Sequence, residues 1–299
     1  MRLAGRRSST NVEDRRGQRG APIAIGGGIG TLVLALIVYM LGGNPAPLIQ
    51  GGGQVAGPGG PGGPGGGPAA GVAMTPEQEA RKEFCSKVLG LSEDVWTELF
   101  PAWSQVDPDV PSQYRPPTMV LFQERVQSGC GVASAASGPF YCPADQKVYL
   151  DTQFFDVMER RLNAPGDFAQ AYVIAHEVGH HVQKLLRATD LVDQVRRQQP
   201  NLANQYSVRL ELQADFYAGV MFHHSERKFR IIEDGDIEEG LNAASRIGDD
   251  TLQKQSQGYA NQESFTHGTS AQRVRWFRKG LQSGDPTQGN TFNIAYERL

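Results

Sequence analysis

Two unusual stretches, residues 21–43 and 51–67, confine the part of this chain that can fold into a compact domain. The first reads APIAIGGGIGTLVLALIVYMLGG and contains no charged side chain. About 20 apolar residues are enough for a helix to cross the hydrocarbon core of a bilayer. The second reads GGGQVAGPGGPGGPGGG and has almost nothing to bury, so it cannot offset the entropy of ordering. A folded domain is therefore expected in residues 74–299.

The residues before the uncharged stretch are basic. Residues 1–20 carry six arginines against two acidic side chains, and positive charge favours the cytoplasmic side of a membrane span. We therefore expect a single-pass protein of the cell membrane, with a basic cytoplasmic N-terminus (1–20), a transmembrane helix (21–43), a Gly/Pro-rich linker (44–73) and an extracytoplasmic domain. The alternative is a cleaved signal peptide, whose apolar region would be shorter. The net charge of −3 gives no basis for nucleic-acid binding.

The domain is expected to be α+β and rich in helix, with a small β-sheet near its middle. Thr75-Pro76 and Gln78 form an N-terminal helix signal, and that helix should end at Gly90. A second helix should follow Ser92 and stop before Pro101. A strand is expected over 118–127, and short extended pieces flank a turn in 138–151. Further helices are expected over 153–162, 167–187, 204–225, 236–252 and 270–281.

Three cysteines, Cys85, Cys130 and Cys142, bear on the compartment. Outside the cytoplasm they can pair. Cys130 and Cys142 flank the turn between the extended pieces and are the natural pair, whereas Cys85 lies in a predicted helix and should be buried. Three buried thiols remain the alternative, because spacing alone proves no connectivity.

The stretch AHEVGHHV, residues 175–182, carries the strongest functional signal. Apolar residues spaced three or four apart predict a helix there, which places His176 and His180 one turn apart on one face. Two imidazoles at this spacing can bind one Zn²⁺, and Glu177 can take a proton from water at the metal. The alternative is a set of polar residues on an exposed face, which the apolar flanks disfavour.

Two histidines leave zinc short of a third protein ligand. The segment LELQADFYAG, residues 210–219, reads as a helix with Glu211 and Asp215 four apart on one face. We expect Glu211 to be the third ligand and Asp215 to accept the far N–H of a ligand histidine. Two solvated acids are the alternative, but the rest of the segment is apolar.

The other histidines carry weaker signals. His181 is expected to be a structural neighbour of the zinc site and not a ligand. His223 and His224 lie near a predicted helix end, where the helix dipole favours them. His267 lies in SFTHGTSAQRVRWF, just before a helix, and could donate to the oxyanion that forms when water attacks a carbonyl. The alternative for His267 is a loop residue that bonds the helix N-terminus or packs on Trp276.

Four stretches, AHEVGHHVQ, ELQADFYAGV, GPFYCPADQKVYLD and SFTHGTSAQRVRWF, occur in this order. Together they resemble the bacterial putative neutral zinc metallopeptidase family, a family of single-pass membrane proteins with an extracytoplasmic peptidase-like domain. The resemblance implies a zincin-like fold with Zn²⁺ on His176, His180 and Glu211, and Glu177 as the base. It also implies that FYCPADQKVYLD lies near the cleft, where an edge strand can pair with extended substrate.

The sequence therefore predicts a membrane-anchored zinc endopeptidase that acts on a peptide or protein substrate. A different class of function stays open, namely a non-catalytic envelope module that contains structural zinc and binds a peptide or protein partner. A fourth ligand, from His267 or His181, would support that alternative, because structural zinc sites are closed by four protein ligands. The sequence does not indicate an oligomeric state.

Overall fold

The computed structural model describes residues 1–17, 74–134 and 137–299. Its regular elements in chain order are β1 (Val12–Asp14), α3 (Pro76–Ser104), β2 (Thr118–Phe122), β3 (Arg125–Ser128), β4 (Gly131–Ser134), β5 (Phe140–Cys142), β6 (Lys147–Asp151), α4 (Phe154–Arg160), α5 (Asp167–Leu185), α6 (Ala188–Gln198), α7 (Ala203–Phe229), α8 (Asp236–Arg246), α9 (Asp249–Gln257) and α10 (Ser270–Ser283). Short 3₁₀ turns include η2 (Pro200–Leu202), η3 (Gln262–Ser264), η4 (Pro286–Gly289) and η5 (Tyr296–Arg298).

The expected transmembrane helix, 21–43, and the linker, 44–73, lie outside the described residues. Within the described ranges, no helix combines the length and the apolar character needed to span a bilayer. The predicted α+β class with a predominance of helix is confirmed.

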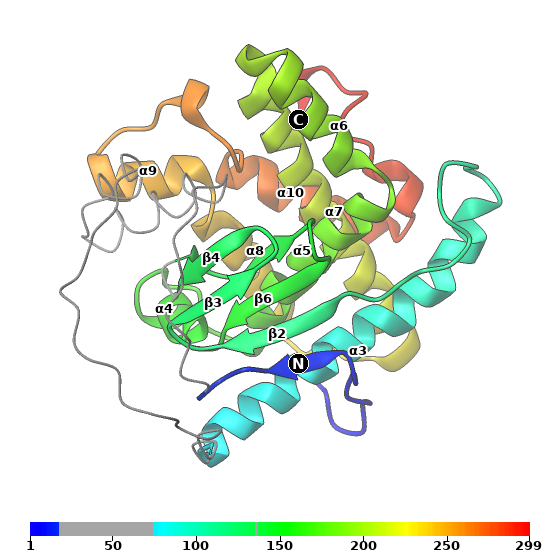
Figure 1. Ribbon diagram of the computed structural model, residues 1–299, viewed down its shortest axis with the longest axis vertical. Helices are drawn as coiled ribbons and strands as arrows, with labels where there is room; N and C mark the ends of the chain where they lie inside the picture. Colours follow the sequence, from blue (N-terminus) through cyan, green and yellow to red (C-terminus); the bar gives the residue numbers. More distant parts are fainter. Residues whose placement is uncertain (18–73, 135–136) are drawn as a thin grey trace, which may run out of the picture.

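The sheet and the helices form two layers (Figure 1). The main sheet has the order β1-β2-β6-β5, in which β1, β2 and β6 are parallel and β5 runs antiparallel to β6. A separate hairpin joins β3 and β4. Helix α5 lies against β5 and β6, α7 and α8 pack on α5, and α10 packs on α7 and α8. The strand β5 is therefore the edge of the main sheet opposite β1.

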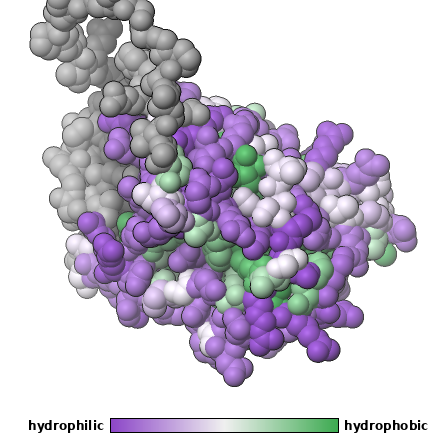
Figure 2. Space-filling view, turned by 90° about the horizontal axis from the view of Figure 1, so that it is seen from below, coloured by the Kyte–Doolittle hydropathy of each residue, from purple (hydrophilic) through white to green (hydrophobic). Residues whose placement is uncertain are grey.

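The main core lies between the sheet and helices α3, α5 and α7. Its largest fully buried side chains include Trp96, Tyr172, Phe168 and Phe216. Burying such side chains is worth about 1.5–3 kcal/mol each before the entropy of ordering is subtracted. Seen from below, the surface is mainly hydrophilic, with a smaller hydrophobic area near its middle (Figure 2).

Helix α3 differs from the two shorter helices that the sequence predicts, because it continues through both Gly90 and Pro101. Its start agrees with the prediction, since Thr75 and Gln78 form a capping box. Gly90 does not end the helix. A Cβ there would lie only 2.7 Å from the carbonyl oxygen of Arg7, so glycine is required for the close approach of the N-terminal segment. Pro101 lies close to the C-terminal end of α3, where little helix follows it.

Two further elements are split relative to the prediction, and one helix is additional. The expected strand 118–127 is split into β2 and β3, with Glu124 at a φ of 64° between them. The expected helix 236–252 is split into α8 and α9, because the backbone of Gly248 between them is extended. A Cβ on Gly248 would lie 2.4 Å from the Ser270 backbone nitrogen, so glycine allows this close approach. Helix α6 was not predicted.

The strand β1 is the largest addition to the predicted fold. Val12, Glu13 and Asp14 pair in parallel with residues of β2, so the basic N-terminal segment joins the main sheet. Residues 1–20 are expected to form a separate cytoplasmic segment, but residues 1–17 pack against α3 and β2 (Figure 1). The sequence does not reveal β1, because a strand of three residues is too short to show an alternating apolar pattern.

The packing of β1 predicts an acid-sensitive contribution to stability. Burial would raise the pKa of Asp14, but hydrogen bonds from Arg16 outweigh it, and this pKa is lowered from 3.8 to about 2. A lowered folded-state pKa stabilises the fold above the unfolded value and loses that contribution as the pH falls through about 2. We expect the difference in Tm between wild type and Asp14→Asn to shrink between pH 5 and pH 2, measured by thermal unfolding in a pH series.

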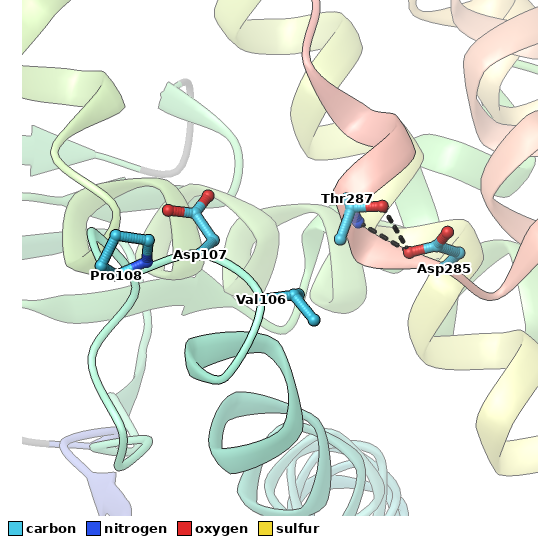
Figure 3. Close-up of a pocket in the computed structure, with 5 residues that line it drawn as sticks. All are labelled: Val106, Asp107, Pro108, Asp285 and Thr287. Atoms are coloured by element: carbon cyan, nitrogen blue, oxygen red, sulfur yellow. Dashed lines mark hydrogen bonds between the residues drawn. The ribbon is translucent and has the colours of Figure 1, made fainter.

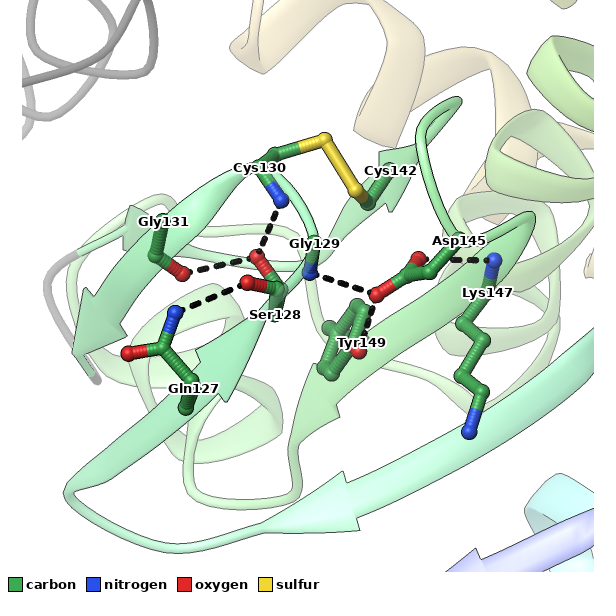
Figure 4. The surroundings of a disulfide bond; sticks show 9 residues. All are labelled: Gln127, Ser128, Gly129, Cys130, Gly131, Cys142, Asp145, Lys147 and Tyr149. Atoms are coloured by element: carbon green, nitrogen blue, oxygen red, sulfur yellow. Dashed lines mark hydrogen bonds between the residues drawn. A yellow bond between two sulfur atoms is a disulfide. The ribbon is translucent and has the colours of Figure 1, made fainter.

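The predicted disulfide is confirmed, since Cys130 and Cys142 are bonded, and Cys85 is free and buried as expected. The bond ties the turn between β3 and β4 to the end of β5 (Figure 4). The Asp145 carboxylate strengthens the same corner by accepting hydrogen bonds from the Gly129 backbone N–H and the Tyr149 hydroxyl. The end of β5 and the turn that follows it are therefore held to the β3–β4 hairpin.

Removing this disulfide should lower the free energy of unfolding. The bond closes a loop with a sequence separation of 12, for which the chain-entropy estimate is about 3 kcal/mol. We expect urea denaturation of Cys130→Ser/Cys142→Ser to show a loss of this size. Reductant should bring wild type to the stability of the double variant and leave the double variant unchanged. A reductant effect on the double variant would contradict this account.

Candidate metal centre

The site forms where helix α5 crosses helix α7. Gly179 of α5 lies against the backbone of Ala214 in α7, and a Cβ on Gly179 would lie 2.8 Å from the Ala214 carbonyl oxygen. The glycine therefore lets the two helices approach closely. This approach brings Glu211, one turn before Ala214, against the two histidines of α5.

His176, His180 and Glu211 come together as the sequence predicts. One ligand atom from each lies within 4.8 Å of the others. The Nε2 atom of His176 is 3.1 Å from one Glu211 carboxylate oxygen, and the Nε2 atom of His180 is 3.5 Å from the other. Two imidazole nitrogens and one carboxylate match the donor set of a catalytic zinc site.

The histidine orientations also suit a metal. The Nδ1 atom of His176 lies 2.8 Å from an Asp215 carboxylate oxygen, as the sequence predicts. The Nδ1 atom of His180 lies 2.8 Å from Oε1 of Gln183. Gln183 donates its own amide N–H to the Leu210 carbonyl, which fixes Oε1 toward His180. Each Nδ1 therefore carries a proton, and each Nε2 is directed to the centre.

Asp215 belongs to a buried network that sequence reasoning missed. Arg273 of α10 makes two hydrogen bonds to the Asp215 carboxylate, at 2.8 and 2.9 Å. The Tyr172 hydroxyl donates to the same carboxylate at 2.5 Å. Arg273 is only 2% exposed and Asp215 is fully buried. This network fixes Asp215, and through it the ring of His176.

The carboxylates around His176 change its protonation. Burial would lower its pKa, but Asp215 and Glu211 outweigh burial and raise this pKa to about 9. Burial would likewise raise the pKa of Glu211, but the adjacent His180 and His176 hold it well below its usual value. The carboxylates of Asp215 and Glu211 therefore favour a positive charge at this position. A divalent metal ion would take the place of the His176 proton.

Glu177 lies on α5 next to His176 and is 8% exposed. In the described part of the chain, no hydrogen bond or ion pair engages its carboxylate. A carboxylate without a committed partner beside a metal centre is available to accept a proton.

His267 lies close enough to Glu211 for the two to interact electrostatically. Its Nδ1 atom is 3.1 Å from an Asp249 carboxylate oxygen, and Asp249 also accepts the backbone N–H groups of Thr266, His267 and Gly268. Asp249 therefore orients the loop and the ring together. No local pattern in the sequence singles out Asp249, because it begins α9, a helix that was not predicted as separate.

The remaining histidines have structural partners. His181 donates from Nε2 to the Arg115 carbonyl oxygen at 2.6 Å, and its Nδ1 accepts from the Tyr141 hydroxyl at 3.1 Å. This arrangement ties α5 to the edge strand β5 and confirms that His181 is a structural neighbour. His223 and His224 bond the carbonyl oxygens of Leu281 and Gly284 at the end of α10. Within the described ranges, neither His181 nor His267 joins the donor group.

Two other groupings do not form comparable sites. Asp167, Asp236 and Glu239 lie close together, but the Met1 amino group is already 2.8 Å from Asp167 and 3.4 Å from Asp236. An open hollow near the end of α3 is lined by Val106, Asp107, Pro108, Asp285 and Thr287 (Figure 3). There the Asp285 carboxylate accepts hydrogen bonds from the backbone N–H and the hydroxyl of Thr287, and it caps the N-terminus of η4.

The fold and the site define an α+β domain in which the two histidines of an HExxH helix and a glutamate form a candidate metal centre. The chain belongs to the family described as putative neutral zinc metallopeptidase, which it matches over residues 1–292. It is 44% identical to uncharacterized protein YpfJ of Escherichia coli K12 over 300 residues, covering 98% of this chain and 99% of that protein. It is 40% identical to uncharacterized protein Rv2575 of Mycobacterium tuberculosis over 211 residues, 67% of each chain. No solved structure matches.

Proposed function

We propose that the chain is a zinc-dependent endopeptidase. The observation that carries the proposal is the convergence of two Nε2 atoms and the Glu211 carboxylate beside an uncommitted Glu177. His176, His180 and Glu211 would hold the metal. Three protein ligands would leave one coordination position of zinc open for water or substrate, as in catalytic sites. Structural zinc sites have four protein ligands and no open position.

The residues of the chain account for the proton transfers. When bound, zinc supplies Lewis acidity, which polarises a peptide carbonyl and makes water more acidic. Glu177 would accept a proton from the attacking water and pass it to the leaving amine. Asp215 and Gln183 keep the two imidazoles in position throughout.

His267 has a role in the same proposal. Burial would lower the pKa of His267, but Asp249 and Glu211 raise it, which favours the protonated ring. With Nδ1–H held by Asp249, the Nε2–H of that protonated ring would donate to the carbonyl oxygen as negative charge develops there. Loss of one such donor typically lowers kcat about 10²–10³-fold. We expect His267→Ala to show a loss in this range with unchanged zinc content, measured by peptide hydrolysis and elemental analysis. An unchanged kcat would remove His267 from the reaction.

The edge strand β5 is the proposed site for substrate backbone. It is the last strand of the main sheet, and Tyr141 links it to His181, the neighbour of His180. An extended peptide can add to such an edge through main-chain hydrogen bonds. The proposed substrate class is therefore an extended segment of a peptide or protein.

Residues 21–43 are uncharged and long enough to enter a bilayer. We propose that they attach the domain to a membrane.

The test is metal content measured together with peptide cleavage. Purified full-length protein, His180→Ala and the control His223→Ala are analysed for zinc and incubated with a mixed peptide library. One zinc per chain, lost in His180→Ala and kept in His223→Ala, with cleavage that follows the zinc, is expected. One zinc without cleavage of any peptide would favour the non-catalytic binding module. Folded protein that binds no zinc would end the proposal.

A further inference from the structure

The N-terminal segment, residues 1–17, is built into the domain and does not merely lie on it. The backbone N–H of Ser9 donates to the Ser86 carbonyl oxygen in α3, at 2.9 Å. The Ser9 hydroxyl donates to Glu93 at 2.6 Å, and both side chains are buried. The absence of a side chain at Gly90 makes room for the Arg7 carbonyl. Helix α3 is therefore shaped to receive this segment.

The far end of the segment is fixed in the same way. β1 adds to β2 in a defined parallel register, with Val12 opposite Met119 and Asp14 opposite Leu121. Arg16, 4% exposed, donates to the Gln78 carbonyl oxygen and to Asp14. A buried arginine requires such partners, because an unpaired buried charge is costly.

The arginines of this segment have acidic partners in the fold. Arg7 pairs with Glu93 and Asp94, and Arg2 pairs with Glu233. Positive charge near a span favours the cytoplasm when it is free to interact with the membrane. Here much of that charge is neutralised by acidic residues of the domain. The arginines therefore have a structural role that does not require the segment to lie in the cytoplasm.

We infer that residues 1–17 and the metal-binding domain lie on the same side of any membrane that the chain meets. A single crossing by residues 21–43 would place residue 17 and residue 74 on opposite sides, which would separate β1 from β2. Exchange of β1 between two copies of the chain would not restore the pairing with β2. After a single crossing, the N-terminal segment of every copy would lie on the side of the membrane opposite to every domain. The proposed attachment must therefore leave both flanks of residues 21–43 in one compartment.

Cysteine labelling in sealed spheroplasts tests this inference. Cys85 is buried and Cys130 and Cys142 are bonded, so the wild-type chain is expected not to react with the maleimide. Ser8 in the N-terminal segment and Ser112 in the domain are both exposed. Full-length Ser8→Cys and Ser112→Cys are treated with a membrane-impermeant maleimide before and after detergent is added, with Thr10→Cys as a second N-terminal site.

The expected result is the same behaviour at both sites, either labelled in intact spheroplasts or protected until detergent is added. Labelling of Ser112→Cys without Ser8→Cys and Thr10→Cys, or the reverse, would overturn the inference. The readout does not depend on zinc or on hydrolysis, so it is independent of the proposed enzyme activity.

Discussion

Replacing Glu177 by glutamine is expected to abolish most peptide hydrolysis while leaving zinc in place. Glutamine has the shape of glutamate but cannot accept the proton of water. General acid–base catalysis contributes about 10²–10⁴-fold to rate, and the loss should be of this order. The proposed metal ligands His176, His180 and Glu211 are untouched, so the zinc content should equal that of wild type.

The control is Glu238→Gln, which changes an exposed glutamate of α8 in the same way. Hydrolysis is followed with a quenched fluorescent peptide, and zinc by elemental analysis of the same samples. The control should match wild type in both. Hydrolysis by Glu177→Gln at the wild-type rate would mean that another group takes the proton.

The second large effect is expected at Asp215, on stability. Asp215→Asn removes the negative charge that faces the buried guanidinium of Arg273. Removing one partner of a buried ion pair costs about 3–5 kcal/mol, because the other charge is left uncompensated. Urea denaturation in the presence of a chelator measures this cost without a contribution from bound metal.

Two comparisons isolate the charge. Asp193→Asn breaks an exposed pair with Arg196 on α6, and such pairs are worth about 0–1 kcal/mol. The double variant Asp215→Asn/Arg273→Met removes both buried charges and should recover much of the lost stability. If Asp215→Asn cost no more than Asp193→Asn, water would have to reach Arg273 in the folded protein.

The parts of the fold that sequence could predict are those with local signals. The α5 pattern and the spacing of His176 and His180 follow from helical periodicity, and Glu211 follows from the apolar helix around it. The helix start at Thr75 and the Cys130–Cys142 pair also depend on neighbouring residues.

The rest depends on contacts between distant segments. Gln183 reads as an ordinary helix residue until Leu210 is known to lie beside it. Arg273 and Asp249 lie far from the motif in sequence, and no spacing rule links them to His176 or His267. Gly90 reads as a helix end, because only the docked Arg7 carbonyl reveals why a side chain is excluded there.

The parallel pairing of β1 with β2 has a consequence for how the chain folds during synthesis. Val12 is made early, but its partner Met119 emerges only after α3 is complete. Pairings of such high sequence separation form late, because the loop-closure entropy must be overcome first. A strand made before α3 is therefore among the last to reach its native place, and in the interval the bare edge of β2 is open to pairing with other chains.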